Sequence, residues 1–94
     1  MTRSRRIRTE EVLVYLGVEK RTFLEPLREE GLFQSEELAP DEADDLRLAK
    51  ILMQEMGVNP AGVDVALRLR RRLLALEDRA RALAHALEAT REPR

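Results

Sequence analysis

The stretch NPAGVDVALRLRRRLLALEDRARALAHAL, residues 59–87, decides the fold. It opens with Asn59 and Pro60, a typical helix start, because asparagine caps the free amides of the first turn and proline fits the first helical position. No further proline follows until Pro93. The sequence therefore predicts one long helix over about residues 60–88, roughly 43 Å in length at 1.5 Å per residue.

Apolar residues recur along this predicted helix in alternating steps of four and three, the spacing of the a and d positions of a coiled coil. A second apolar stripe, made of Val63, Leu67 and Leu74, lies to one side of the first. The first two turns can thus pack on a small domain while the remainder offers a seam to another helix. The residues of this leucine seam are Gly62, Ala66, Leu69, Leu73, Leu76, Ala80, Leu83 and Leu87.

The distal leucines of the seam would face water in a monomer, at a cost of roughly 1.5–3 kcal/mol each. We therefore expect a homodimer, with Leu69, Leu73, Leu76, Ala80, Leu83 and Leu87 at the contact. The alternative is a hairpin that folds back near Asp78, where neither glycine nor proline supports a turn.

Three shorter helices are predicted before the long one. Thr9 is a suitable N-cap for a first helix that ends at Gly17, and residues 1–8 are interpreted as a basic flexible arm. A second helix is expected over residues 19–30, with a kink or a break near Pro26, because proline removes a hydrogen bond and clashes with the preceding turn.

Gly31 is expected to end that second helix, and an acidic connection follows over residues 32–40. A third helix should begin at Pro40 and end at Gly57, with an apolar face built on Leu46, Ala49, Met53 and Met56. The predicted organisation is thus an arm (1–8), a domain of short helices (9–57) and a long C-terminal helix (58–94).

The composition supports an all-α chain and excludes several kinds of chemistry. Among 94 residues, 44% are hydrophobic, 3% are aromatic, none is cysteine and His85 is the single histidine. Disulfides, thiolate zinc sites and multi-histidine metal sites are therefore excluded, and we expect no enzymatic activity and no cofactor. Nothing resembles a signal peptide or a membrane span, so we expect a cytoplasmic protein.

The net charge of −1 conceals charges that are segregated along the chain. Four arginines lie within residues 3–8, six acids and no base lie within residues 33–45, and the run RLRRR occupies residues 68–72. We expect Arg68, Arg71 and Arg72 of this run to be solvated or paired with acids. A partner will meet these local patches rather than the average charge.

Two segments resemble the MerR-type helix-turn-helix superfamily. EEVLVYLGVEKRTFLEPLREEGLF (10–33) is similar to its first two helices and their Leu-Gly-Val turn, and LRLAKILMQEMGVNPAGVDVALRLRRRLLALE (46–77) is similar to its third and long helices. Within it, GVNPAGVDVALRL (57–69) resembles two branches, the CbpM-type chaperone modulators and the HspR-type repressors. The resemblance implies a MerR-like domain of short helices followed by a coiled-coil dimerisation helix.

The two branches imply different partners. In DNA-binding members the second helix enters the major groove, and a wing carries basic side chains to the DNA phosphates. Here the connection in the place of the wing is acidic and too short for a comfortable two-stranded wing, so Lys20 and Arg21 remain as the candidate phosphate contacts. Solvated helix charges are the simpler interpretation of these two residues.

CbpM-type modulators bind the J-domain of DnaJ-like co-chaperones, which carries a basic helix beside its His-Pro-Asp loop. The resemblance therefore implies a regulator of the Hsp70 system in which acids steer the J-domain and Leu32, Phe33 and Leu38 supply apolar contacts. Simple solvation and helix-dipole complementation are the alternative for the acids, and a core position is the alternative for Phe33. The candidate steering acids are Glu36, Glu37, Asp41, Glu42, Asp44 and Asp45.

Overall fold

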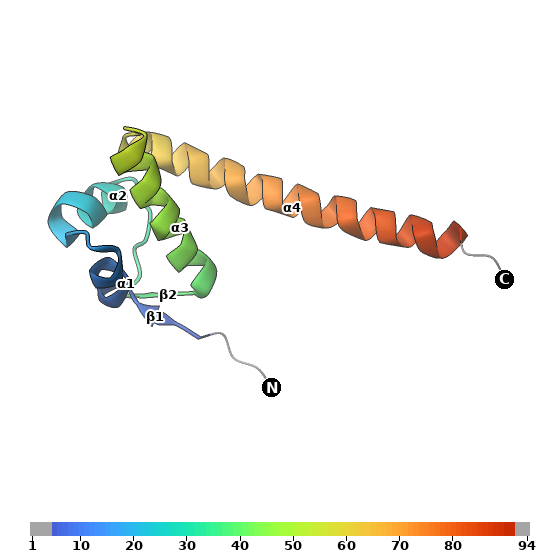
Figure 1. Cartoon of the computed structure of the whole chain (residues 1–94), viewed down its shortest axis with the longest axis horizontal. Coiled ribbons are helices and arrows are strands. Elements are labelled where there is room, and N and C mark those ends of the chain that lie inside the picture. The colour runs from blue at the N-terminus through green and yellow to red at the C-terminus, as the bar shows by residue number, and fades with distance from the viewer. Residues whose placement is uncertain (1–4, 92–94) are drawn as a thin grey trace.

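The computed structural model describes residues 5–91, most of which are helical (Figure 1). Short helices form a small domain, and the last helix extends well beyond it. The expectation of a helical chain is confirmed, apart from two strands of two residues each. In chain order the elements are β1 (Ile7–Arg8), α1 (Thr9–Leu16), the π-helical turn η1 (Lys20–Leu24), α2 (Glu25–Glu29), β2 (Glu37–Leu38), α3 (Pro40–Lys50), the π-helical turn η2 (Ile51–Glu55) and α4 (Pro60–Arg91).

Helix α1 ends where the sequence predicts. Gly17 adopts the left-handed conformation with φ 73°, and the amide of Val18 donates to the carbonyl of Leu13 at 3.1 Å. The ammonium of Lys50, at the end of α3, donates to the carbonyl of Leu16 at 2.7 Å. This contact places a cation at the negative end of α1 and ties the two helices together.

The second predicted helix is divided near its proline into η1 and α2. A break at this place was one of the two predicted outcomes, the other being a kink. The π-helical turn η1 precedes Pro26, and the amide of Glu25 donates to the carbonyl of Lys20 across this wider turn. Pro26 then lies in the first turn of α2, where its missing amide removes no helical hydrogen bond. Gly31, with φ 88°, follows the helix as predicted.

The N-terminal segment does not behave as a free arm throughout. Ile7 and Arg8 form β1, which pairs antiparallel with β2, so the predicted arm is wrong for these two residues; residues 1–4 lie outside the described chain. Thr9 is also not the predicted N-cap. It is the first residue of α1, and its buried hydroxyl donates to the carbonyl of Ser35 at 2.9 Å.

Helices α3 and α4 begin at the predicted residues. The carboxylate of Glu42 accepts a hydrogen bond from the amide of Ala39 at 2.8 Å, which caps α3 just before Pro40. The side-chain oxygen of Asn59 accepts one from the amide of Gly62 at 2.7 Å, which confirms Asn59 as the cap of α4.

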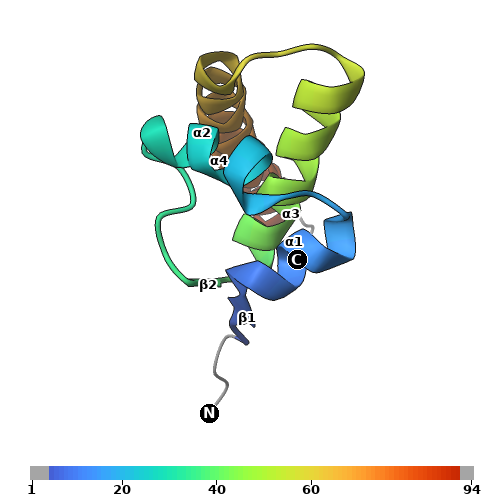
Figure 2. The ribbon, with the colours of Figure 1, turned by 90° about the vertical axis from the view of Figure 1, so that its left-hand side faces the viewer.

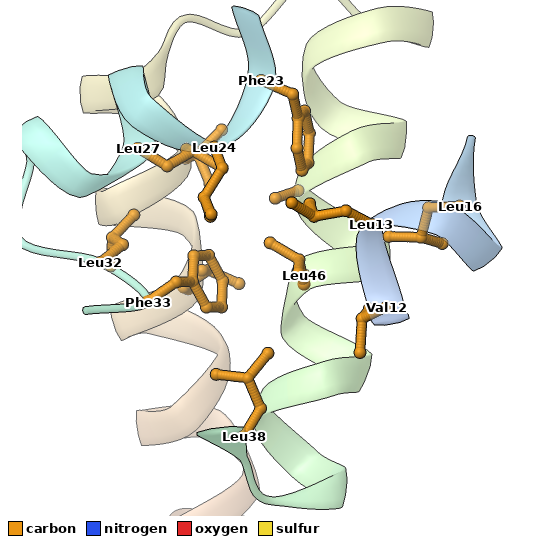
Figure 3. Packing of buried hydrophobic residues seen from close by; sticks show 13 residues of the cluster. Val12, Leu13, Leu16, Phe23, Leu24, Leu27, Leu32, Phe33, Leu38 and Leu46 are labelled. Atoms are coloured by element: carbon orange, nitrogen blue, oxygen red, sulfur yellow. The ribbon is translucent and has the colours of Figure 1, made fainter. Parts of the chain in front are cut away.

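The core is almost entirely aliphatic and draws on every helix of the domain (Figure 3). Leu46 and Ala49 of α3 are wholly buried, as predicted. Met56 was expected on the same face but is 66% exposed, because the π-helical turn η2 rotates the chain away from the α-helical period. The buried apolar residues are Val12, Leu13, Leu16, Phe23, Leu24, Leu27, Leu32, Phe33, Leu38, Leu46, Ala49, Val63 and Leu67.

Helix α4 packs on the domain only at its beginning. Val63 and Leu67 are wholly buried, whereas every residue from 71 to 91 is exposed. The 32 residues of α4 span roughly 48 Å, and Figure 1 shows most of that length standing clear of the other helices. No helix within residues 5–91 combines the length and the apolar character needed to cross a membrane.

Two ion pairs that share one buried carboxylate join α3 to α4. The carboxylate of Asp45 lies 2.8 Å from the guanidinium of Arg70 and 3.1 Å from that of Arg71, and Asp45 itself is only 4% exposed. Two arginines on adjacent positions of α4 thus hold one carboxylate of α3. The two ion pairs fix the rotation of α4 against the domain and so determine which face of α4 points outward.

Replacing Asp45 by asparagine should lower the free energy of unfolding by about 1–3 kcal/mol, since charge-assisted hydrogen bonds to a buried carboxylate are lost. Urea denaturation followed by circular dichroism, at one fixed chain concentration, measures this change. Asp78→Asn is the matched control, because Asp78 pairs with Arg81 at 3.2 Å on an exposed surface and should change stability by less than about 0.5 kcal/mol. Equal losses in the two variants would contradict the structural role of Asp45.

Candidate protein-interaction surfaces

Four of the six predicted steering acids lie on an open surface. Glu36 and Glu37 stand around β2, while Asp41 and Asp44 lie in the first turns of α3, and all four are exposed. Glu36 has a long contact with Arg28 at 3.8 Å, which leaves its carboxylate largely in water. The side chain of Glu42 is 41% exposed, and it caps α3 and lies 3.9 Å from Arg6. We call Glu36, Glu37, Asp41 and Asp44 the acidic face.

Asp45 does not belong to this acidic face. Its carboxylate points into the contact between α3 and α4 and is held by Arg70 and Arg71. The prediction that Asp45 steers a partner is therefore wrong. Asp45 lies in the acidic run of the sequence, but on α3 it faces α4, where it is buried against Arg70 and Arg71.

The predicted apolar contacts are core residues. Leu38 has no exposed surface, and Leu32 and Phe33 are buried as well, so the prediction that Phe33 and Leu38 contact a partner is wrong for this conformation. Figure 3 shows all three side chains within the core. The alternative interpretation of Phe33 as a core residue is the correct one.

The connection that follows α2 is held by Arg28. Phe33 has φ 53°, an unusual backbone conformation for an aromatic residue, and its carbonyl accepts a hydrogen bond from the guanidinium of Arg28 at 2.8 Å. Gln34 closes the arrangement by donating to the carbonyl of Arg28 at 2.6 Å. These contacts, together with burial of the ring, stabilise the left-handed backbone that turns Phe33 inward.

A groove between α1 and α3 was missed by the sequence analysis. It has a volume of about 330 Å³ and lies beside the acidic face. The available signal was Tyr15, which falls outside the apolar stripe of Val12, Leu13 and Leu16 on α1 and is highly exposed. The groove is lined by Ile7, Glu11, Val12, Tyr15, Leu16, Ala43, Asp44 and Arg47.

The leucine seam is an exposed apolar stripe on α4. Leu69, Leu73, Leu76, Leu83 and Leu87 are between 52% and 63% exposed, and Ala80 is exposed between them. Of the neighbouring stripe, Val63 and Leu67 are buried against the domain, in line with the predicted packing of the first two turns, whereas Leu74 is 44% exposed. Of the arginines in the RLRRR run, Arg68 pairs with Asp64 at 3.0 Å and Arg71 with Asp45, which agrees with the expectation of pairing.

The candidate phosphate contacts, Lys20 and Arg21, are exposed at the start of η1. Other cations near the N-terminus have acidic neighbours: Arg8 lies 3.4 Å from Glu10, and Arg6 lies near Glu42. Acids therefore partly neutralise the basic side chains that a polyanion would need.

Among residues 5–91, no three histidine or acidic side chains are grouped so that they could hold a metal ion. His85 is exposed near the end of α4. Comparison with protein-family models, with curated proteins and with solved structures found no match.

Replacing Leu38 by alanine should lower the free energy of unfolding by about 2–5 kcal/mol, because it opens a cavity in the core. Thermal and urea denaturation measure the loss. Glu36→Ala, two residues earlier on the exposed surface, serves as the control and should stay within about 0.5 kcal/mol of the unmodified chain. An unchanged stability for Leu38→Ala would contradict the core position of Leu38 and would again allow it to contact a partner.

Proposed function

We propose that this chain is a homodimeric adaptor that binds the J-domain of a DnaJ-like co-chaperone and thereby regulates the Hsp70 system. The acidic face is the observation that carries the proposal. By the resemblance, Glu36 and Glu37 fall in the segment that would be a basic wing in a DNA-binding MerR-like protein, and Asp41 and Asp44 follow on α3. The four exposed carboxylates suit a basic protein surface. The MerR-like arrangement of the domain and the coiled coil of α4 are parts of this proposal.

The geometry around β2 also argues against a wing. The only strand within residues 33–45 is the two-residue β2, whose partner is β1 from the N-terminus, and residues 40–45 already belong to α3. The connection therefore lies along the domain instead of forming a hairpin of its own. With acids on this segment, approach to a polyanion is opposed by Coulomb repulsion.

Dimerisation is supported by the leucine seam. Five leucines at a and d spacing stay more than half exposed along a helix that the domain does not cover. Exposed apolar stripes of this kind are typical of interaction sites. A second copy of α4 offers a surface of the same spacing, so the two seams can pack together.

The chain should sediment as a dimer at micromolar concentration, and Leu76→Glu should shift it to a monomer because the charge enters the centre of the seam. Analytical ultracentrifugation measures the mass, and circular dichroism checks that the helix persists. The matched control is Ala82→Glu, which adds the same side chain at an exposed position off the seam and should leave the dimer intact. A monomeric unmodified chain would contradict this part of the proposal.

The J-domain of a DnaJ-like protein should bind the unmodified chain, and the double change Asp41→Lys with Asp44→Lys should weaken binding at least about tenfold, through loss of charge complementarity. Isothermal titration calorimetry at two salt concentrations measures the affinity and its screening. Glu29→Lys with Glu30→Lys makes the same change in charge on exposed residues at the end of α2 and should have little effect.

A DNA-binding regulator is the second candidate, favoured only by the exposure of Lys20 and Arg21 on η1. Titration with random duplex DNA separates the two functions. Affinity tighter than about 1 µM near physiological salt, falling steeply with added salt and lost in Lys20→Glu with Arg21→Glu, would overturn the adaptor proposal.

A further inference from the structure

A groove lined largely by apolar side chains lies between α1 and α3 on the surface of the domain. Figure 2 shows α1 lying beside α3. Side chains of both helices line the groove. Its volume of about 330 Å³ is at the lower end of the range for small-molecule pockets, roughly 300–1,000 Å³. A groove of this size suits a large apolar side chain delivered by another protein.

The walls of the groove are apolar and its rim is charged. Val12 and Leu16 belong to the core and form the floor, while Ala43 contributes from α3. Tyr15 is 85% exposed and stands at one wall, where nothing in residues 5–91 buries its ring. A tyrosine with this exposure beside an apolar floor has the character of an interface anchor.

Carboxylates lie on both sides of the opening. Glu11 comes from α1 and Asp44 from α3, and Asp41 lies one turn before Asp44 on the same face of its helix. Among residues 5–91, Arg47 is the one cation that lines the groove. The acidic face therefore continues onto the rim of the groove. An incoming apolar side chain can be buried in the groove while a neighbouring lysine or arginine pairs with the carboxylates of the rim.

We propose that this groove receives an apolar side chain from a basic amphipathic α-helix of the partner protein, with Tyr15 as the anchor and Glu11 and Asp44 as the charged clamp. This inference rests on the proposed function and deepens it, because it moves the apolar contact from Phe33 and Leu38, which are buried, to a surface that is open. The face of Tyr15 also attracts an arginine or lysine on the same helix through a cation–π contact.

A second copy of this chain is a poorer occupant of the groove. The surfaces nearest to it are acidic, so two such faces would repel each other. Nucleic acid is disfavoured by the same carboxylates. The basic helix is the occupant whose charge and apolar content both fit.

The test uses the full chain and the J-domain of a DnaJ-like protein as the probe. Tyr15→Ala should weaken binding at least about tenfold in calorimetry, while Tyr15→Phe should restore affinity to within about threefold, because the ring and not the hydroxyl makes the contact. Met56→Ala removes another exposed apolar side chain, directly after η2 and outside the groove, and should bind as the unmodified chain does. Circular dichroism and sedimentation of each variant should be unchanged, since Tyr15 is neither in the core nor on the leucine seam.

Each other outcome overturns the inference in a recognisable way. Binding by Tyr15→Ala within twofold of the unmodified chain would overturn the groove and leave the adaptor proposal standing. Loss of the dimer in Tyr15→Ala would identify the groove as a contact between copies and overturn the basic-helix occupant. Absence of J-domain binding by the unmodified chain would overturn both proposals together.

Discussion

The packing of the first turns of α4 on the domain, chiefly against α2, is the constraint on which the rest of the structure depends. Val63 and Leu67 fill the core from one face of α4, and Asp45 holds Arg70 and Arg71 beside them. Because a helix has one fixed period, choosing this face for the core sends the leucine seam to the opposite flank. The leucine seam stays exposed because the small domain covers only the beginning of the long helix α4. The packing of Val63 and Leu67 on the domain therefore leaves the leucine seam facing solvent.

Local signals in the sequence predict the helix boundaries well. Gly17, Pro26, Gly31 and Asn59 act through their own backbone or side-chain chemistry, and each does so within a turn of its position. The pairing of β1 with β2 could not be predicted from the sequence. A strand of two residues is too short to show an alternating pattern, and α1, η1 and α2 lie between the two strands in the chain. Local pattern is informative only where the physical cause is local.

The candidate surfaces likewise combine features that the local sequence predicts with features that depend on contacts between distant segments. The seam and the acidic run are visible in the sequence, yet the sequence cannot tell which members of each are open to solvent. Asp45 and Leu38 lie in the same acidic stretch as exposed residues, but contacts with α4 and the core bury them. The groove arises only when α1 and α3 are brought together, although the off-stripe position of Tyr15 was a readable hint. What results is a chain with two separate surfaces: an apolar one on α4 and an acidic, grooved one on the domain.

The central proposal is that the leucine seam joins two copies of the chain while the acidic face and its groove bind a basic partner. The dimer must therefore be able to bind the partner without dissociating. Light scattering on a chromatographed mixture of this 10.8 kDa chain with an excess of a J-domain measures this directly. The account predicts a complex whose mass equals two copies of the chain and two J-domains. A complex containing a single chain, or a chain that elutes with no J-domain attached, would contradict it.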